Sequence, residues 1–240
     1  MARSARTIIP YMPHHVIQRG HNKESVFNLD YSYLYYTSNL LKFKEEYGCK
    51  LYAYCLMPNH VHLLIDPGEE PDNLSKLMKR ISGRQTRFVN KRSKRSGSLW
   101  EGRFKSSIVS TNEYLHACCR YIELNPVQAG LVQKPQEYRW SSARSKVTEY
   151  EDSLVDLDPF YTDIGDTADE RQVHYLEYLL EGIPDEEEKL LKEAIQREQI
   201  TGSSKFCQQV EKDHGVKLYR RGPGRPRKEK KNLAAPIFVE

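Results

Sequence analysis

The sequence has no long hydrophobic run: no stretch of about 18 apolar residues occurs, and the mean hydropathy is -0.73. A membrane-spanning helix needs about 20 consecutive apolar residues, so no transmembrane segment is predicted. The N-terminal residues are basic, but the apolar stretch beside them is too short for a signal peptide. We therefore expect no membrane partner.

Cysteines are few and unpaired: there are five, and no two of them form a CxxC pair. This count and spacing argue against a secreted disulfide framework and against a structural zinc site. A chain of 240 residues is long enough for one ordinary domain plus an appendage, and buries enough surface without such cross-links. We therefore predict a protein of the reducing cytoplasm.

A large charge of one sign is also missing, because charged segments of opposite sign cancel to a net charge of +4. Residues 76–105 carry +10, residues 149–193 carry -13, and residues 217–231 carry +7. Two concentrated positive segments indicate a polyanionic partner. The alternative is that each charged run is only a solvated face.

The hydrophobic pattern predicts an α+β protein in which helices lie on one face of an antiparallel sheet, in the order β-α-β-β-α-β-α. A capping box of Ser110 and Glu113 begins the last of these helices, which we expect to end at Asn125 because Pro126 follows. The expected strands are 7–19, 50–57, 60–66 and 104–110, and the other expected helices are 30–47 and 72–90.

Composition divides the chain into three parts. Residues 1–148 contain the expected sheet, and residues 149–218 form an acidic linker and helical accessory region. Residues 219–240 form a basic tail, which we expect to be flexible. Helical patterns within the accessory region cover 168–181, 186–199 and 203–214.

Two histidines in one predicted strand form the first candidate site. His60 and His62 are two residues apart, so both imidazoles point to the same face and can reach one metal ion. The alternative is that both rings only pack and form hydrogen bonds. The other histidines, including His14 and His15, show no ligand spacing and are expected not to bind metal.

A tyrosine on a predicted helix forms the second candidate. Tyr121 and Asn125 are four residues apart and share a helix face. A phenol attacks a phosphate well when a metal neutralises the phosphate and a nearby group takes the proton. Tyr121 can also be a core aromatic, and Tyr114, seven residues earlier, occupies about the same face.

Three motifs in order resemble one known family. MPNHVHLL at 57–64, WEGRF at 100–104 and RYIELNPVQAGLV at 120–132 are similar to the REP-associated tyrosine transposases, single-tyrosine members of the HUH endonuclease superfamily. The resemblance covers residues 7–145. It implies a ferredoxin-like HUH core with metal ligands His60 and His62, the nucleophile Tyr121, and Asn125 as a polar third ligand.

The resemblance implies an enzyme that cuts and rejoins single-stranded DNA at or near palindromic hairpins. A divalent ion, Mg²⁺ or Mn²⁺, would neutralise the scissile phosphate while Tyr121 forms a 5′-phosphotyrosine and releases a 3′-hydroxyl. That linkage keeps the energy of the broken bond, which agrees with the absence of a GxxxxGK[ST] loop. The implied location is the bacterial cytoplasm, with the nucleoid when DNA is bound.

DNA contacts are predicted from basic and aromatic residues. The helix at 72–90 has a basic face that can follow phosphates, and Trp100 can stack on an unpaired base or fill the core. The tail resembles an AT-hook, although Pro223 replaces an arginine of that motif. The predicted DNA-binding residues are Lys79, Arg80, Arg84, Arg87, Trp100, Arg103, Lys105, Arg225 and Arg227, and the family resemblance implies that Arg19 also faces the DNA.

Two other functions stay open at this stage. One is a DNA-binding regulator that keeps the fold but does not cut, which the basic tail and the acidic middle would suit. The other is a nuclease that uses water as its nucleophile. The sequence also leaves open a monomer or a homodimer, because in related transposases the tyrosine helix can serve a partner subunit.

Overall fold

A four-stranded antiparallel sheet forms the centre of the computed structural model, which describes residues 6–110 and 114–216. The strand order is β2-β3-β1-β4, and every neighbouring pair is antiparallel. The predicted α+β class and the order of elements up to the third long helix are confirmed. The strands are β1 (His14–Arg19), β2 (Lys50–Met57), β3 (His60–Asp66) and β4 (Lys105–Ile108).

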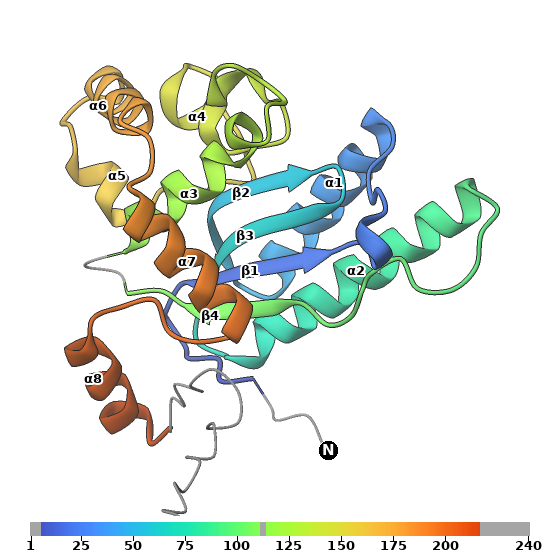
Figure 1. The fold of residues 1–240 in the computed structure, drawn as a ribbon, viewed down its shortest axis with the longest axis horizontal. Helices are drawn as coiled ribbons and strands as arrows, with labels where there is room; N and C mark the ends of the chain where they lie inside the picture. The colour runs from blue at the N-terminus through green and yellow to red at the C-terminus, as the bar shows by residue number, and fades with distance from the viewer. Residues whose placement is uncertain (1–5, 111–113, 217–240) are drawn as a thin grey trace, which may run out of the picture.

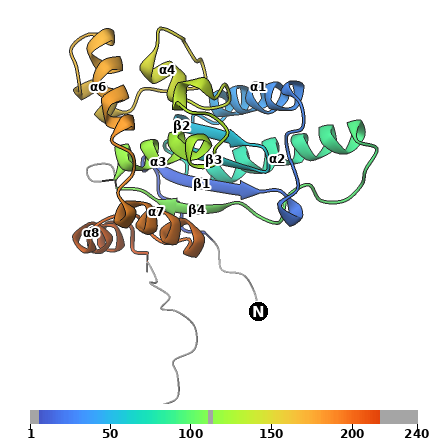
Figure 2. The same ribbon diagram turned by 45° about the horizontal axis from the view of Figure 1, so that its top comes forward.

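Helices cover both faces of this sheet, whereas the sequence predicted helices on one face. Helices α1 (Asp30–Glu46) and α2 (Asp72–Arg92) lie together on one side, and α3 (Leu115–Gln128) lies on the other (Figures 1 and 2). The reason is that β2 and β3 are buried on both faces, so alternate residues enter two separate cores. Leu63 packs toward α1 and α2, while its neighbour Leu64 packs toward α3.

The accessory helices are joined to the core and form part of its second layer. Helix α7 (Asp185–Arg197) contacts α3, β4 and β1, and α6 (Ala168–Leu180) shares an apolar cluster with Leu124 of α3. The remaining helices are α4 (Ala143–Val147), α5 (Pro159–Asp163) and α8 (Ser204–His214). Within residues 6–110 and 114–216, no helix has the length and apolar character needed to cross a membrane.

Helix α3 continues through Pro126 to Gln128, whereas the sequence predicted that it ends at Asn125. Proline has no N–H to donate to the carbonyl four residues earlier, which belongs to Ile122. The side-chain amide of Asn125 compensates: its Nδ2 donates to the Ile122 carbonyl at 3.4 Å and to the Tyr121 carbonyl at 2.6 Å. The predicted capping residue Glu113 lies outside the described residues.

Candidate functional site

His60 and His62 lie on the α3 side of β3, as their spacing predicted. Their ring centroids are 4.9 Å apart, and both residues line a groove of about 860 Å³. Tyr121 and Asn125 line the same groove from α3. We call this cavity the His–Tyr groove. The four residues that the motifs singled out for chemistry therefore meet in one place, within one chain.

The hydrogen bonds of the two histidines favour presenting their Nε2 atoms to the groove. The Asn59 side-chain oxygen lies 2.6 Å from Nδ1 of His60, and only a protonated Nδ1 can donate to it. On His62, Nδ1 lies 2.9 Å from Nε2 of His15, so that atom is also occupied. Only Nε2 of each ring is left for another partner.

Both rings are neutral at ordinary pH because they are removed from water. Burial, followed by the positive charge of Arg19, lowers the pKa of His60 to about 4. Burial lowers the pKa of His62 well below its ordinary value, and His15, His60 and Arg19 act in the same direction. Neutral imidazole is the form that binds metals.

His15 is a site residue that the sequence did not identify. It is fully buried, its Nε2 lies 2.9 Å from His62, and its ring packs edge-on against Tyr121 with the centroids 5.7 Å apart. Burial lowers its pKa to about 3. The pairing of β1 with β3 creates this contact, and no spacing within β1 reveals it. The prediction that His15 is not a direct ligand stays untested.

Tyr121 lies beside the histidines and is largely sheltered. Its ring centroid is 5.8 Å from that of His62, in an edge-on arrangement, and the residue is 5% exposed. Burial, with the Cys118 thiol and the Glu188 carboxylate, raises the pKa of Tyr121 to about 12, while the charge of Arg19 opposes the increase. The phenol is therefore protonated at rest and needs help to ionise.

The donor set fits a divalent metal with mixed nitrogen and oxygen ligands. The amide nitrogen of Asn125 is used by the backbone of α3, which leaves its Oδ1 as a possible ligand beside two Nε2 atoms. No group of three His, Cys, Asp or Glu side chains in the described part of the chain could hold a metal ion. An amide oxygen would thus have to complete this set.

The walls of the His–Tyr groove are mainly positive. Three of the predicted DNA-binding residues line it: Arg19 of β1, Lys105 of β4, and Arg103 from the segment just before β4. Arg6 adds a fourth positive charge, and Glu101 and Glu198 are the acids of the lining. A polyanion is therefore the ligand class that the groove suits.

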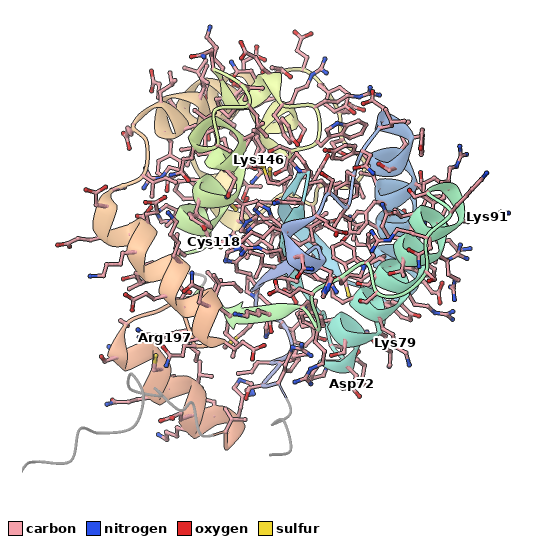
Figure 3. The ribbon with its side chains drawn as sticks, turned by 45° about the vertical axis from the view of Figure 1, so that its right-hand side comes forward. Asp72, Lys79, Lys91, Cys118, Lys146 and Arg197 are labelled. Carbon is pink, nitrogen blue, oxygen red and sulfur yellow. The ribbon has the colours of Figure 1, made fainter. Side chains whose placement is uncertain are left out.

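The predicted basic face of α2 lies away from this groove. Lys79, Arg80 and Arg87 are exposed, and Arg84 is half-buried, on the helix that covers the opposite face of the sheet. Lys79 and Arg197 lie on opposite sides of the molecule (Figure 3). Whether α2 binds DNA stays a prediction, but its side chains do not share the groove with Tyr121.

Trp100 fills the core and is not free to stack on a base. It is 5% exposed, its Nε1 donates to the Ser82 carbonyl at 3.1 Å, and it belongs to the cluster between the sheet and α2. An isolated antiparallel bridge also joins the backbone of Trp100 to that of Gly20. The other predicted contacts, Arg225 and Arg227, lie outside the described residues.

Comparisons with known proteins point to one kind of transposase. Residues 9–125 match the family model described as transposase IS200 like. A Haemophilus influenzae protein assigned to the REP-associated tyrosine transposases is 27% identical over 107 residues, which are 41% of this chain. The match spans 61% of that relative's length.

The fold agrees with a solved structure of a REP-associated tyrosine transposase bound to a REP hairpin. The TM-score is 0.54 at 20% identity, and the match covers 66% of this chain and 90% of the other. At this identity the likeness concerns the fold. Residues 9–125, which carry the paired histidines and the tyrosine helix, are thus similar to the IS200-like transposases, and the chain resembles the REP-associated tyrosine transposases among its known relatives.

Proposed function

We propose that this protein is a metal-dependent DNA strand transferase that cuts and rejoins single-stranded DNA at or near palindromic hairpins. One observation carries the proposal: Tyr121, His60, His62 and Asn125 line a single groove with positive walls. The solved relative bound to a REP hairpin supports a hairpin as the partner. Oligomeric state plays no part in the proposal, because the four residues meet within one chain.

Held by the two histidines and Asn125, Mg²⁺ or Mn²⁺ would neutralise negative charge on the scissile phosphate. The Tyr121 oxygen then attacks phosphorus, an O–P bond to tyrosine forms, and the bond from phosphorus to the 3′ oxygen breaks. The phenolic proton leaves and the released 3′ oxygen gains a proton. Because one phosphodiester replaces another, a later 3′-hydroxyl can reverse the step without ATP.

Arg19 has two roles in this proposal. Its charge opposes the burial of Tyr121 and so eases loss of the phenolic proton. It also lines the groove, where a guanidinium can bind a phosphate oxygen with directed hydrogen bonds. Cys118 and Cys119 of the same helix are fully buried, and burial raises both thiol pKa values, so neither competes as a nucleophile.

A denaturing gel tests the proposal against its two rivals. Oligonucleotides labelled at the 3′ end, carrying repeated palindromes of the host genome, are incubated with the protein and Mn²⁺. A transferase gives a labelled band that migrates with the protein. A free 5′-phosphate fragment would instead show water as the nucleophile, and an uncut but bound hairpin would show a regulator.

His15 provides a further prediction, which concerns the metal. If Nδ1–H of His62 donates to Nε2 of His15, the His62 lone pair on Nε2 stays directed at the groove. His15→Phe keeps a ring of similar size but removes the acceptor. We expect Mn²⁺ affinity, measured by calorimetry, to fall about 10–100-fold.

His15→Gln is the matched control, because its side-chain oxygen can accept the same hydrogen bond. It should keep Mn²⁺ affinity close to that of the unmodified protein. Equal affinity in His15→Phe and the unmodified protein would show that His15 only fills space.

A further inference from the structure

Helix α7 is strongly asymmetric in charge, although it belongs to the acidic accessory region. Its first turn consists of four acids, Asp185 to Glu188. Lys192 and Arg197 follow toward its other end, and both line the His–Tyr groove together with Gln196. Two of the few cations of this region are therefore placed at the candidate site.

The acidic end fixes α7 to the tyrosine helix. Arg120, which directly precedes Tyr121, is 5% exposed and bonds to Glu187 at 2.8 Å. Gln128, at the other end of α3, donates to Glu188 at 2.9 Å. Leu191, Ala194 and Ile195 of α7 are buried beneath these contacts. The helix is thus held in a defined position relative to Tyr121.

The opposite end of α7 contacts β4 beside the groove. Lys105 of β4 donates to the Gln196 carbonyl at 3.3 Å, and Arg6 pairs with Glu198 at 3.6 Å. Lys192 and Arg197 of α7 therefore line the same groove as Arg19, Arg103 and Lys105. In the described part of the chain, Lys192 pairs with Glu188 at 2.6 Å. Arg197 pairs with Glu193 at 3.1 Å. Pairs this exposed are weak, so a phosphate can replace them.

We propose that α7 is a substrate-binding element whose Lys192 and Arg197 contact backbone phosphates of the strand held at Tyr121. This inference rests on the proposed function. It assigns a role to a segment that lies outside residues 9–125, the part that matches the transposase family. A single strand would be gripped from two sides, by the sheet and by the accessory helix.

The salt dependence of binding tests this inference. Binding of a fluorescent oligothymidylate is measured by anisotropy at several salt concentrations, in a Tyr121→Phe background so that no strand is cut. Each lost phosphate contact reduces the slope of log affinity against log salt by about 0.7. Lys192→Gln combined with Arg197→Gln should therefore reduce the slope by about 1.4 and weaken binding.

Lys189→Gln combined with Lys205→Gln is the matched control. It removes the same charge from exposed positions of the accessory helices that do not line the groove. The control should keep the slope of the parent protein. Equal slopes for all three proteins, or the same decrease in both double variants, would overturn the inference.

Failure of the proposed function would look different. If the protein with Tyr121 intact forms no covalent adduct while the two double variants still differ in slope, α7 binds DNA but the transferase proposal is wrong. Thermal melting confirms that each variant is folded, which we expect because all four substituted side chains are exposed.

Discussion

Tyr121→Phe is expected to abolish the covalent protein–DNA adduct and to reduce strand cleavage by several orders of magnitude. The variant loses only the oxygen that would attack phosphorus, and keeps the ring that packs edge-on against His15 and His62. DNA binding and metal binding should therefore persist. The measurement is the denaturing gel with a 3′-labelled hairpin, accompanied by anisotropy with the same DNA.

Tyr114→Phe is the control for this experiment. Tyr114 occupies about the same helical face in the sequence, seven residues before Tyr121, but it packs against the apolar cluster under α3 and does not line the groove. Its variant should form the adduct at the normal rate. An adduct that survives in Tyr121→Phe, or disappears in Tyr114→Phe, would reject Tyr121 as the nucleophile.

Lys146→Met is expected to reduce the free energy of unfolding by about 3–5 kcal/mol. Lys146 is 1% exposed and lies between two buried carboxylates, 3.4 Å from Glu123 and 3.2 Å from Asp158. Without the ammonium, two carboxylates would face each other in the interior with no countercharge. Desolvation is expensive for an unpaired buried charge, and that cost dominates the effect.

The position of Glu123 connects this network to the candidate site. Glu123 is two residues after Tyr121 on α3, and it also accepts hydrogen bonds from Ser142 at 2.6 Å and from Tyr175 at 2.7 Å. The network therefore joins the tyrosine helix to α4, α5 and α6. We expect Lys146→Met to loosen α3 as well as to destabilise the protein.

Urea denaturation measures this effect through the midpoint and the slope of the transition. Arg139→Met is the control, because this variant also removes one positive charge from an ion pair. Arg139 pairs with Asp30 at the surface, where the two side chains are 57% and 69% exposed. The control should lose less than about 1 kcal/mol of the free energy of unfolding. Adding Glu123→Gln to Lys146→Met should recover part of the stability. An unchanged midpoint in Lys146→Met would contradict a paired buried network.

Local patterns were enough to predict most elements and to single out four residues that line the His–Tyr groove. The predicted strands 50–57 and 60–66 coincide with β2 and β3, and the helix predicted at 72–90 ends within two residues of α2. The two-residue period of a strand alone places His60 and His62 on the same face of that strand. The 3.6-residue period of a helix places Tyr121 and Asn125 on the same face of that helix. These features depend on residues close together in the chain.

Features created by distant contacts could not be read in this way. The hydrogen bond between His15 and His62 depends on the register of β1 against β3, and the two residues are 47 positions apart. The burial of Trp100 and the placement of α2 behind the sheet likewise follow from packing. Charge patterns show that a helix is basic, but not which side of a sheet it covers.

The amino-acid order alone established the α+β class, the histidine pair, the tyrosine helix and the resemblance to a transposase family, because each is written in short-range spacing. Folding alone brought His15 against His62 and placed α7 at the groove that Arg103 and Lys105 also line. Such neighbours arise when hydrophobic burial brings together segments far apart in the chain, and the sequence has no local signal for them.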